Sequence, residues 1–189
     1  MRTLLLSFVA CGCAASQPGP RANSAAASAI ASATAPPATA KIEPRSGSSL
    51  SGTARFVDVN GALGAHVEVE QAAAGLHGVH IHEKGDCSDP EAKSAGGHYN
   101  PAKGAHHGGP STPVRHGGDL GNIEVGSDGK GVLDVLVQDL TIAGPDNGVV
   151  GRAIVVHEKA DDLQTDPAGN SGARIGCGQI LPPTAQPSR

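Results

Sequence analysis

The sequence predicts an all-β fold, a sandwich or barrel of short strands in one domain, from three observations. Glycine and proline number 27 and 14 among 189 residues, which indicates many turns. Short segments alternate apolar and polar residues, as strands with one buried face do. Aromatic residues make up only 2%, so Val, Ile, Leu and Ala must supply the core. No segment has the period of a convincing amphipathic helix.

The first 12 residues are predicted to be an export signal. Met1 and Arg2 precede an apolar run at 4–10 that is too short to span a bilayer. Small residues precede both Cys11 and Cys13, which favours a lipoprotein-type cleavage that leaves a lipidated cysteine. Cys11 fits this pattern better, and ordinary signal-peptide cleavage and retention of the segment are the alternatives. The protein is therefore expected to be exported to the periplasm or cell envelope and anchored to a membrane.

The segment 13–47 consists mainly of Ala, Ser, Pro and Thr and shows no hydrophobic period. Such a segment cannot bury enough apolar surface to offset the entropy of ordering it, so we expect a disordered tether. The folded domain is expected over 48–182, and a flexible tail over 183–189.

Candidate strands follow one another within the domain. Thr53, Arg55, Val57 and Val59 share one face of the first strand. The candidates lie at 53–59, 67–70, 76–83, 120–125, 131–142, 149–157 and 175–181. Turn signals lie at 60–61, 128–129 and 145–148. The long connections, 84–119 and 158–174, are expected to be functional or disordered.

Histidines concentrate in one region, since seven of the nine lie between positions 77 and 116. Histidine is the commonest neutral ligand for zinc and copper. His80 and His82 are two residues apart on a strand, so their side chains leave the same face and can converge on one ion. His77 points to the opposite face and is expected to be a hydrogen-bonded, partly buried residue. His157, at the end of an apolar run, can deliver a third ligand.

The loop after these strand histidines supplies a second set of ligands. It consists of His98, His107, His116 and Asp119. Three nitrogens and one carboxylate oxygen suit structural zinc, whereas an all-histidine set with an open position suits redox-active copper. The alternative is a histidine-rich loop that merely scavenges metal. It does not account for a strand-borne pair, a loop quartet and a distant His157 together.

These motifs resemble the copper/zinc superoxide dismutase family. The matching segments, in order, are 76–83, 97–101, 107–110, 116–122, 151–163 and 169–178. The resemblance covers roughly 48–182. It implies an eight-stranded Greek-key β-barrel or sandwich, with long metal-binding and electrostatic loops, that disproportionates superoxide to oxygen and hydrogen peroxide.

The resemblance also implies one copper and one zinc ion per subunit and a role for each matching residue. The copper ligands would be His80, His82, His98 and His157. The zinc ligands would be His98, His107, His116 and Asp119. His98 would bridge both ions and take part in catalysis with the channel arginine, Arg174. Asp161 matches a carboxylate that links a copper-ligand histidine to a zinc-ligand histidine, and Cys87 and Cys177 match the family disulfide. His77 is expected, from its direction on the strand alone, to support the site from the opposite face.

Two departures from the family pattern concern the loops. The interval from His98 to His107 is one residue longer than in the commonest version, which leaves His106 eight residues after His98. The Gly-Gly-Pro turn and the spacing to His116 favour His107 over His106 as the zinc ligand. The electrostatic loop, 161–174, is shorter than in eukaryotic enzymes and has no lysine after Lys159.

The substrate implied by the resemblance, superoxide, is an anion, whereas residues 48–182 carry 9 Lys and Arg against 17 Asp and Glu, a formal balance of −8. Attraction must therefore be local, from the metal ions and Arg174. No nucleic-acid partner is expected. A copper/zinc storage or delivery protein on the same fold is the alternative function, and a delivery protein is expected to have lost copper ligands or Arg174. The resemblance leaves both a monomer and a homodimer open.

Overall fold

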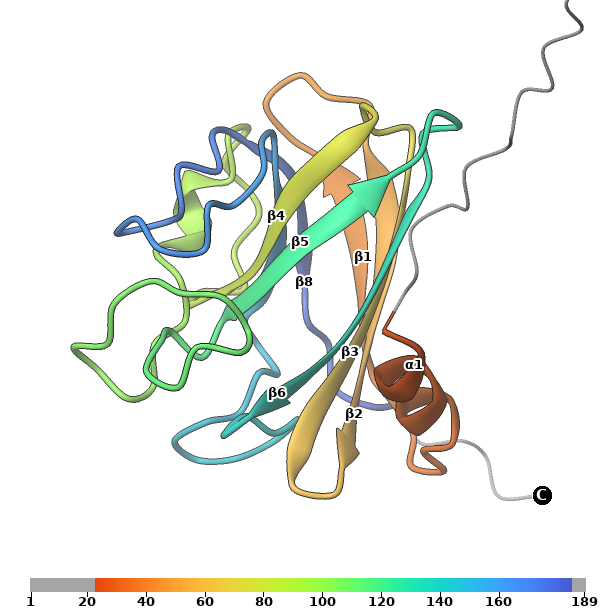
Figure 1. Cartoon of the computed structure of the whole chain (residues 1–189), viewed down its shortest axis with the longest axis vertical. Coiled ribbons are helices and arrows are strands. Elements are labelled where there is room, and N and C mark those ends of the chain that lie inside the picture. The colour runs from red at the N-terminus through yellow and green to blue at the C-terminus, as the bar shows by residue number, and fades with distance from the viewer. Residues whose placement is uncertain (1–22, 185–189) are drawn as a thin grey trace, which may run out of the picture.

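The computed structural model describes residues 23–184, which form a closed barrel of eight antiparallel strands (Figure 1). The strands are β1 (Ala38–Pro44), β2 (Ser51–Val59), β3 (Ala62–Glu70), β4 (Gly75–His82), β5 (Asp119–Val125), β6 (Gly131–Gln138), β7 (Ala153–His157) and β8 (Arg174–Gln179). A helix, α1 (Ser24–Ala31), precedes them, and a 3₁₀ turn, η1 (Lys93–Ala95), lies in the loop after β4. The predicted export signal with Cys11 lies outside the described residues, as does most of the predicted tail.

The strands follow one another around the barrel in the order β1-β2-β3-β6-β5-β4-β7-β8. Consecutive strands β4, β5 and β6 are neighbours, and β7 returns to pair with the free side of β4, which is a Greek-key arrangement. The Asn-Gly turn joins β2 to β3 because both residues adopt positive φ, 48° at Asn60 and 85° at Gly61. The predicted all-β fold and eight-stranded barrel are confirmed.

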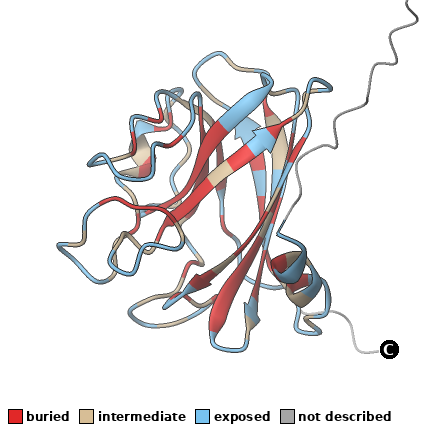
Figure 2. Ribbon diagram, in the orientation of Figure 1, coloured by how far each residue is buried: buried red, intermediate tan, exposed pale blue. Residues whose placement is uncertain are grey.

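Buried residues lie along the strands and their connections (Figure 2), and mainly aliphatic side chains fill the barrel. The largest completely buried side chains are the aromatic Phe56 and several aliphatic ones, including Leu63, Ile81, Leu120, Ile154 and Ile180. The strand β4 contributes Val79 and Ile81 to this core, so its alternate residues, His80 and His82, point to the other face. The core thereby orients the histidine-bearing face of β4 away from the barrel axis.

The prediction of a disordered tether over 13–47 is wrong for β1. This strand pairs with β2 on one side and with β8 on the other, and so closes the barrel. Ala38, Ala40 and Ile42 point inward and are at most 3% exposed. Two of these three side chains, those of Ala38 and Ala40, are single methyl groups. Their hydropathy contrasts only weakly with that of Thr39, the outward residue between them. The pattern therefore gave a weak strand signal.

The same prediction is wrong for α1, which packs on the outer surface of the barrel against β2, β3 and β6. Ile30 is 4% exposed, and its Cγ1 lies only 2.7 Å from where a Cβ on Gly64 would be. Glycine at position 64 thus makes room for the helix. The face of β2 with Thr53, Arg55 and Val57 is this outer one, and α1 explains why Val57 is buried. Among residues 23–184, no helix is long and apolar enough to cross a membrane.

Candidate metal centre

The strand histidines lie on the outer face of two neighbouring strands, β4 and β7. The register of this pair sets Val155 opposite His80. His157, two residues beyond Val155, therefore lies on the same face as His80 and His82. All three histidines are buried, with at most 3% of their surface exposed. Loops, rather than the barrel, cover them.

Two backbone hydrogen bonds fasten the loop between β4 and β5 to Ile81 near the end of β4, and a third joins the two loop segments to each other. Tyr99 N–H donates to Ile81 O, Ile81 N–H donates to Gly118 O, and Gly118 N–H donates to Tyr99 O, each at 2.8 Å. His98 and Asp119 are the chain neighbours of Tyr99 and Gly118. This small network therefore brings both of them to the histidine-bearing face of β4.

Two groups of side chains that could hold a metal ion result, and both His80 and His98 belong to each of them. In the first, the histidine cluster, the ligand atoms lie within 4.8 Å of one another; its members are His80, His82, His98 and His157. The second group with the same spacing contains His80, His98, His107 and Asp119. His116 was predicted in this second set from the sequence, in place of His80.

His116 lies beside the same carboxylate as the other predicted loop ligands. The distances to Asp119 Oδ1 are 2.8 Å from His98 Nδ1, 3.1 Å from His107 Nδ1 and 3.3 Å from His116 Nδ1. We call these four residues the mixed cluster. The structure thus brings together all of the residues that the sequence singled out as loop ligands.

Six buried ring nitrogens in the two clusters make no hydrogen bond, although two of them, Nδ1 of His107 and Nδ1 of His116, lie 3.1 and 3.3 Å from Asp119 Oδ1. The six are Nδ1 of His80, His107 and His116, and Nε2 of His82, His98 and His157. Burying a polar atom without a partner is costly, so six of them in one place fit a site built for metal ions. The mixed cluster offers imidazole and carboxylate, which suit zinc, and the histidine cluster offers imidazole alone, which suits copper.

Asp161 orients one histidine from each cluster. His80 Nε2–H donates to Asp161 Oδ2 and His107 Nε2–H donates to Asp161 Oδ1, each at 2.8 Å. A neutral imidazole carries one N–H, so these bonds leave Nδ1 of both rings with a free lone pair. Asp161 is 3% exposed. The carboxylate therefore selects the tautomer that each cluster needs to bind a metal.

Backbone carbonyls select the tautomers of two further histidines. His82 Nδ1–H donates to Gly96 O at 2.9 Å, and His157 Nδ1–H donates to Gly172 O at 3.3 Å. Both rings then present Nε2 to the histidine cluster. Both carbonyls belong to glycines in the long loops, so these loops orient the strand histidines as well as covering them.

Two residues that were not predicted from the sequence to have a role, Asn122 and Gly169, allow Asp161 to take up its position. The Asn122 side chain accepts the Asp161 N–H at 2.7 Å and donates to Asp161 O at 2.9 Å. Gly169 has φ 60°, and a Cβ there would come within 1.8 Å of Asp161 Oδ1. Both residues lie inside the family-like motifs, which is the signal that could have identified them.

His77 and His106 lie outside both clusters. His77 is 3% exposed, and its ring nitrogens lie 2.9 Å from His157 O and 2.8 Å from Ala73 O, so it supports the backbone of a cluster residue. The side chain of His106 is 82% exposed and pairs with Asp166. The other oxygen of this carboxylate accepts the His107 N–H at 2.7 Å. The structure therefore places His107, and not His106, in the mixed cluster.

Cys87 and Cys177 form the predicted disulfide, with an S–S distance of 2.01 Å. It ties the loop after β4 to β8, which also carries Arg174. The Arg174 guanidinium donates to Ala92 O and Gly96 O at 2.7 Å each. A pocket of about 460 Å³ beside it is also lined by Lys93, an exposed lysine that the sequence analysis did not single out.

Burial lowers the pKa of the histidine cluster. The pKa of His157 falls to about 4, mainly through burial and in part through the nearby charges of His98 and Arg174. Burial also lowers the pKa of His80 and His82 well below the ordinary value, and it lowers that of His98 against the opposing hydrogen bond to Asp119. The rings therefore remain neutral, as metal ligands must be, in mildly acidic solution.

Metal-free protein is expected to lose stability as the pH falls from about 6.5 to about 4. In this window the unfolded chain binds protons on these histidines and the folded chain does not, so acid favours unfolding. Each histidine can contribute up to about 1.4 kcal/mol per pH unit. Urea denaturation at a series of pH values, in the presence of a chelator, measures this slope. The exposed His106→Gln variant should keep it, and a flat profile in the parent protein would contradict the prediction.

Comparisons with known proteins agree with this site. A family model described as copper/zinc superoxide dismutase matches residues 50–180. A protein named superoxide dismutase [Cu-Zn] from Deinococcus radiodurans is 45% identical over 139 residues, which are 68% of this chain and 76% of that protein.

Two proteins named extracellular superoxide dismutase [Cu-Zn] are also similar. The one from Caenorhabditis elegans is 43% identical over 137 residues, 69% of this chain and 61% of that protein. The one from Drosophila melanogaster is 48% identical over 122 residues, 60% of this chain and 65% of that protein. The match thus spans less than two thirds of the length of these two relatives.

Proposed function

The chain belongs to the copper/zinc superoxide dismutase family, and from this membership we propose which of its residues carry the reaction. The activity is that of an oxidoreductase: two superoxide ions and two protons give dioxygen and hydrogen peroxide, with copper and zinc as cofactors. The observation that carries the assignment of residues is the set of six buried ring nitrogens that make no hydrogen bond.

In this assignment the histidine cluster holds copper and the mixed cluster holds zinc. Copper would be bound by His80 Nδ1 and by Nε2 of His82, His98 and His157. Zinc would be bound by Asp119 Oδ1 and by Nδ1 of His98, His107 and His116. When bound, copper supplies a one-electron redox couple, and zinc supplies a fixed positive charge beside it. Every ligand comes from one chain, so a homodimer, which the family resemblance leaves open, would pair two complete sites.

The protein's own residues bind the substrate and supply a proton. Arg174 attracts superoxide, because a guanidinium has five N–H donors and only two of its nitrogens are engaged with Ala92 and Gly96. Its charge is needed since the whole chain has a formal net charge of −4, which repels an anion. His98 Nε2 holds and releases one of the two protons that hydrogen peroxide requires, as the family resemblance implies.

Superoxide consumption by the metal-loaded protein tests this function. The rate per copper ion should far exceed that of copper complexed by EDTA in the same buffer, with one copper and one zinc bound per chain. A rate no faster than that of the EDTA complex, at full metal content, would refute the dismutase function and favour a storage or delivery protein.

The Arg174→Ala variant is expected to lower kcat/KM for superoxide by about tenfold to a hundredfold, within the range attributed to electrostatic focusing. The dependence of the rate on ionic strength should weaken at the same time. Stopped-flow measurements at several salt concentrations give both quantities. The matched control is Arg55→Ala, which removes the same charge from an exposed position on β2. Unchanged rate and salt dependence in Arg174→Ala would show that Arg174 does not guide the substrate.

Export of the protein is supported by two relatives that are named extracellular. We extend this to a periplasmic or cell-envelope location with a lipidated Cys11, which lies outside the described residues. Mass spectrometry of the mature N-terminus tests the attachment. A lipid-modified cysteine at position 11 is expected, and an unmodified mature N-terminus would exclude the anchor.

A further inference from the structure

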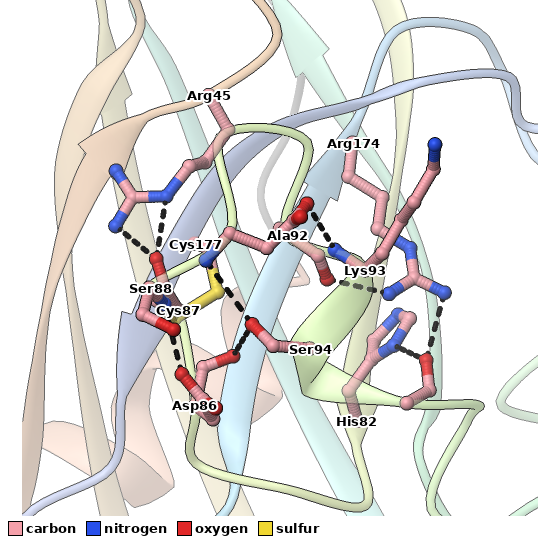
Figure 3. Close-up of a disulfide and its surroundings, with 12 residues drawn as sticks. Arg45, His82, Asp86, Cys87, Ser88, Ala92, Lys93, Ser94, Arg174 and Cys177 are labelled. Carbon is pink, nitrogen blue, oxygen red and sulfur yellow. Dashed lines mark hydrogen bonds between the residues drawn. A yellow bond between two sulfur atoms is a disulfide. The ribbon is translucent and has the colours of Figure 1, made fainter.

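The corner that follows β1 makes an unusual set of contacts to the disulfide loop, which we define as residues 83–97. The half-buried Arg45 donates to the carbonyl oxygen of Cys87 from two nitrogens, Nε at 2.9 Å and Nη2 at 2.6 Å (Figure 3). Its third nitrogen, Nη1, donates to Pro44 O at 2.7 Å. The guanidinium therefore clamps one peptide group of a disulfide cysteine against the end of β1.

The same corner holds the start of β8. Arg45 N–H donates to Ile175 O at 2.9 Å, and Ser46 Oγ donates to Arg174 O at 2.9 Å. Ser46 N–H donates to Pro90 O, in the disulfide loop, at 2.8 Å. Residues 45–46 thus fix two segments relative to each other: the disulfide loop and the backbone of Arg174.

The position of the disulfide loop matters because its carbonyls orient two residues of the site. Gly96 O accepts hydrogen bonds from both Arg174 Nη2 and His82 Nδ1, and Ala92 O accepts one from Arg174 Nη1 (Figure 3). The disulfide restrains the Cys87 side chain, and the N–H of the next residue, Ser88, donates to Asp86 Oδ1 at 2.9 Å. Arg45 holds the other end of this peptide group, the carbonyl oxygen of Cys87, and its two N–H donors define a direction as well as a distance.

We propose that Arg45 is a positioning residue for Arg174, which acts by fixing Cys87 and so the loop carbonyls that aim the Arg174 guanidinium at the anion. This inference rests on the proposed function. Arg45 is not among the residues that line the pocket beside Arg174, so its effect passes through the loop. A displacement of a substrate-binding group by about 1 Å can cost up to a hundredfold in rate, so a loss of about tenfold in kcat/KM is expected on removal of Arg45.

The test compares Arg45→Ala, Arg45→Lys and the control Arg55→Ala in the full metal-loaded chain. Arg45→Ala should lower kcat/KM about tenfold. It should also raise the inhibition constant of phosphate, used as a competing anion, about tenfold. Arg45→Lys keeps the charge but lacks the two-nitrogen fork, so it should recover only part of both quantities. Arg55→Ala should change neither. Values for Arg45→Ala within twofold of the parent protein would overturn the proposal.

A double-mutant cycle separates positioning from a direct effect of charge. In an Arg174→Ala background, Arg45→Ala should have no further effect on kcat/KM, because the group that it positions is gone; additive losses would overturn the proposal. A readout independent of activity is the rate at which dithiothreitol reduces the disulfide. This rate should rise severalfold in Arg45→Ala and Arg45→Lys and not in Arg55→Ala. If the parent protein were inactive but the variants showed this pattern of reduction rates, the dismutase function would be refuted. The structural claim that Arg45 fixes Cys87 would still be supported.

Discussion

Removal of both metal ions is expected to lower the melting temperature of the protein by on the order of 20 °C. Without metals, six ring nitrogens stay buried with no hydrogen bond, and the loops that cover them lose their main cross-links. When the concentration of a free ion is a thousandfold above its Kd, binding adds about 4 kcal/mol to the free energy of unfolding. At roughly 2 to 4 °C per kcal/mol for a chain of this size, two ions account for the shift.

Calorimetry of metal-loaded and chelator-treated protein measures this shift, and adding back zinc and copper separately divides it between the clusters. His98→Gln should lose more of the metal-dependent stability than any other single ligand change, because His98 belongs to the histidine cluster and also contacts Asp119 in the mixed cluster. His106→Gln is the matched control and should retain all of it, since the side chain of His106 is 82% exposed. Equal melting temperatures with and without metal would contradict the assignment of the clusters.

Loss of the disulfide is expected to lower the free energy of unfolding by about 4 to 5 kcal/mol. The bond joins residues 90 positions apart, so it removes much of the freedom of the unfolded chain. We suggest the pair Cys87→Ala with Cys177→Ala, because Cys177 is 1% exposed in a small cluster with Ala92, Ala95 and Val155. Alanine there adds no buried hydroxyl.

Urea denaturation of the metal-free parent and of the double variant gives the difference in stability without a contribution from metal binding. The parent in dithiothreitol should match the double variant, since both lack the bond. A loss below about 1 kcal/mol would show that other contacts of the loop, including the clamp by Arg45, hold it without the bond.

The strands after residue 50 could be anticipated because their residues alternate and because turn residues separate them. The Asn60-Gly61 turn shows this directly, since both residues adopt the positive φ that such a pair favours. The strand β1 alternates as well, with Thr39 and Lys41 between inward residues, but its signal is weak. Its inward Ala38 and Ala40 carry little hydrophobic signal, and its place in the fold depends on pairing with β8, more than 130 residues away in the chain.

The helix α1 escaped prediction for a related reason. It buries little beyond Ala26 and Ile30, and its partner surface exists only after β2 and β3 have paired. A short Ala-rich and Ser-rich segment is a poor helix by itself, because helices of this length are marginal in water without tertiary packing. The prediction of a disordered segment over 13–47 therefore missed both α1 and β1.

At the metal centre, the spacing and the types of the residues already indicate which side chains can meet and which metals suit them. The two-residue spacing of His80 and His82 dictates a common face on any strand, and the types of side chain dictate the affinity for copper or zinc. The sequence does not indicate which atom of each side chain is available to bind a metal, because this depends on the tertiary structure. Asp161 and the carbonyls of Gly96 and Gly172 select the free nitrogen of each ring, and Arg45 fixes the loop that aims Arg174. These choices depend on hydrogen bonds between segments distant in the chain, and no local pattern encodes the direction of such bonds.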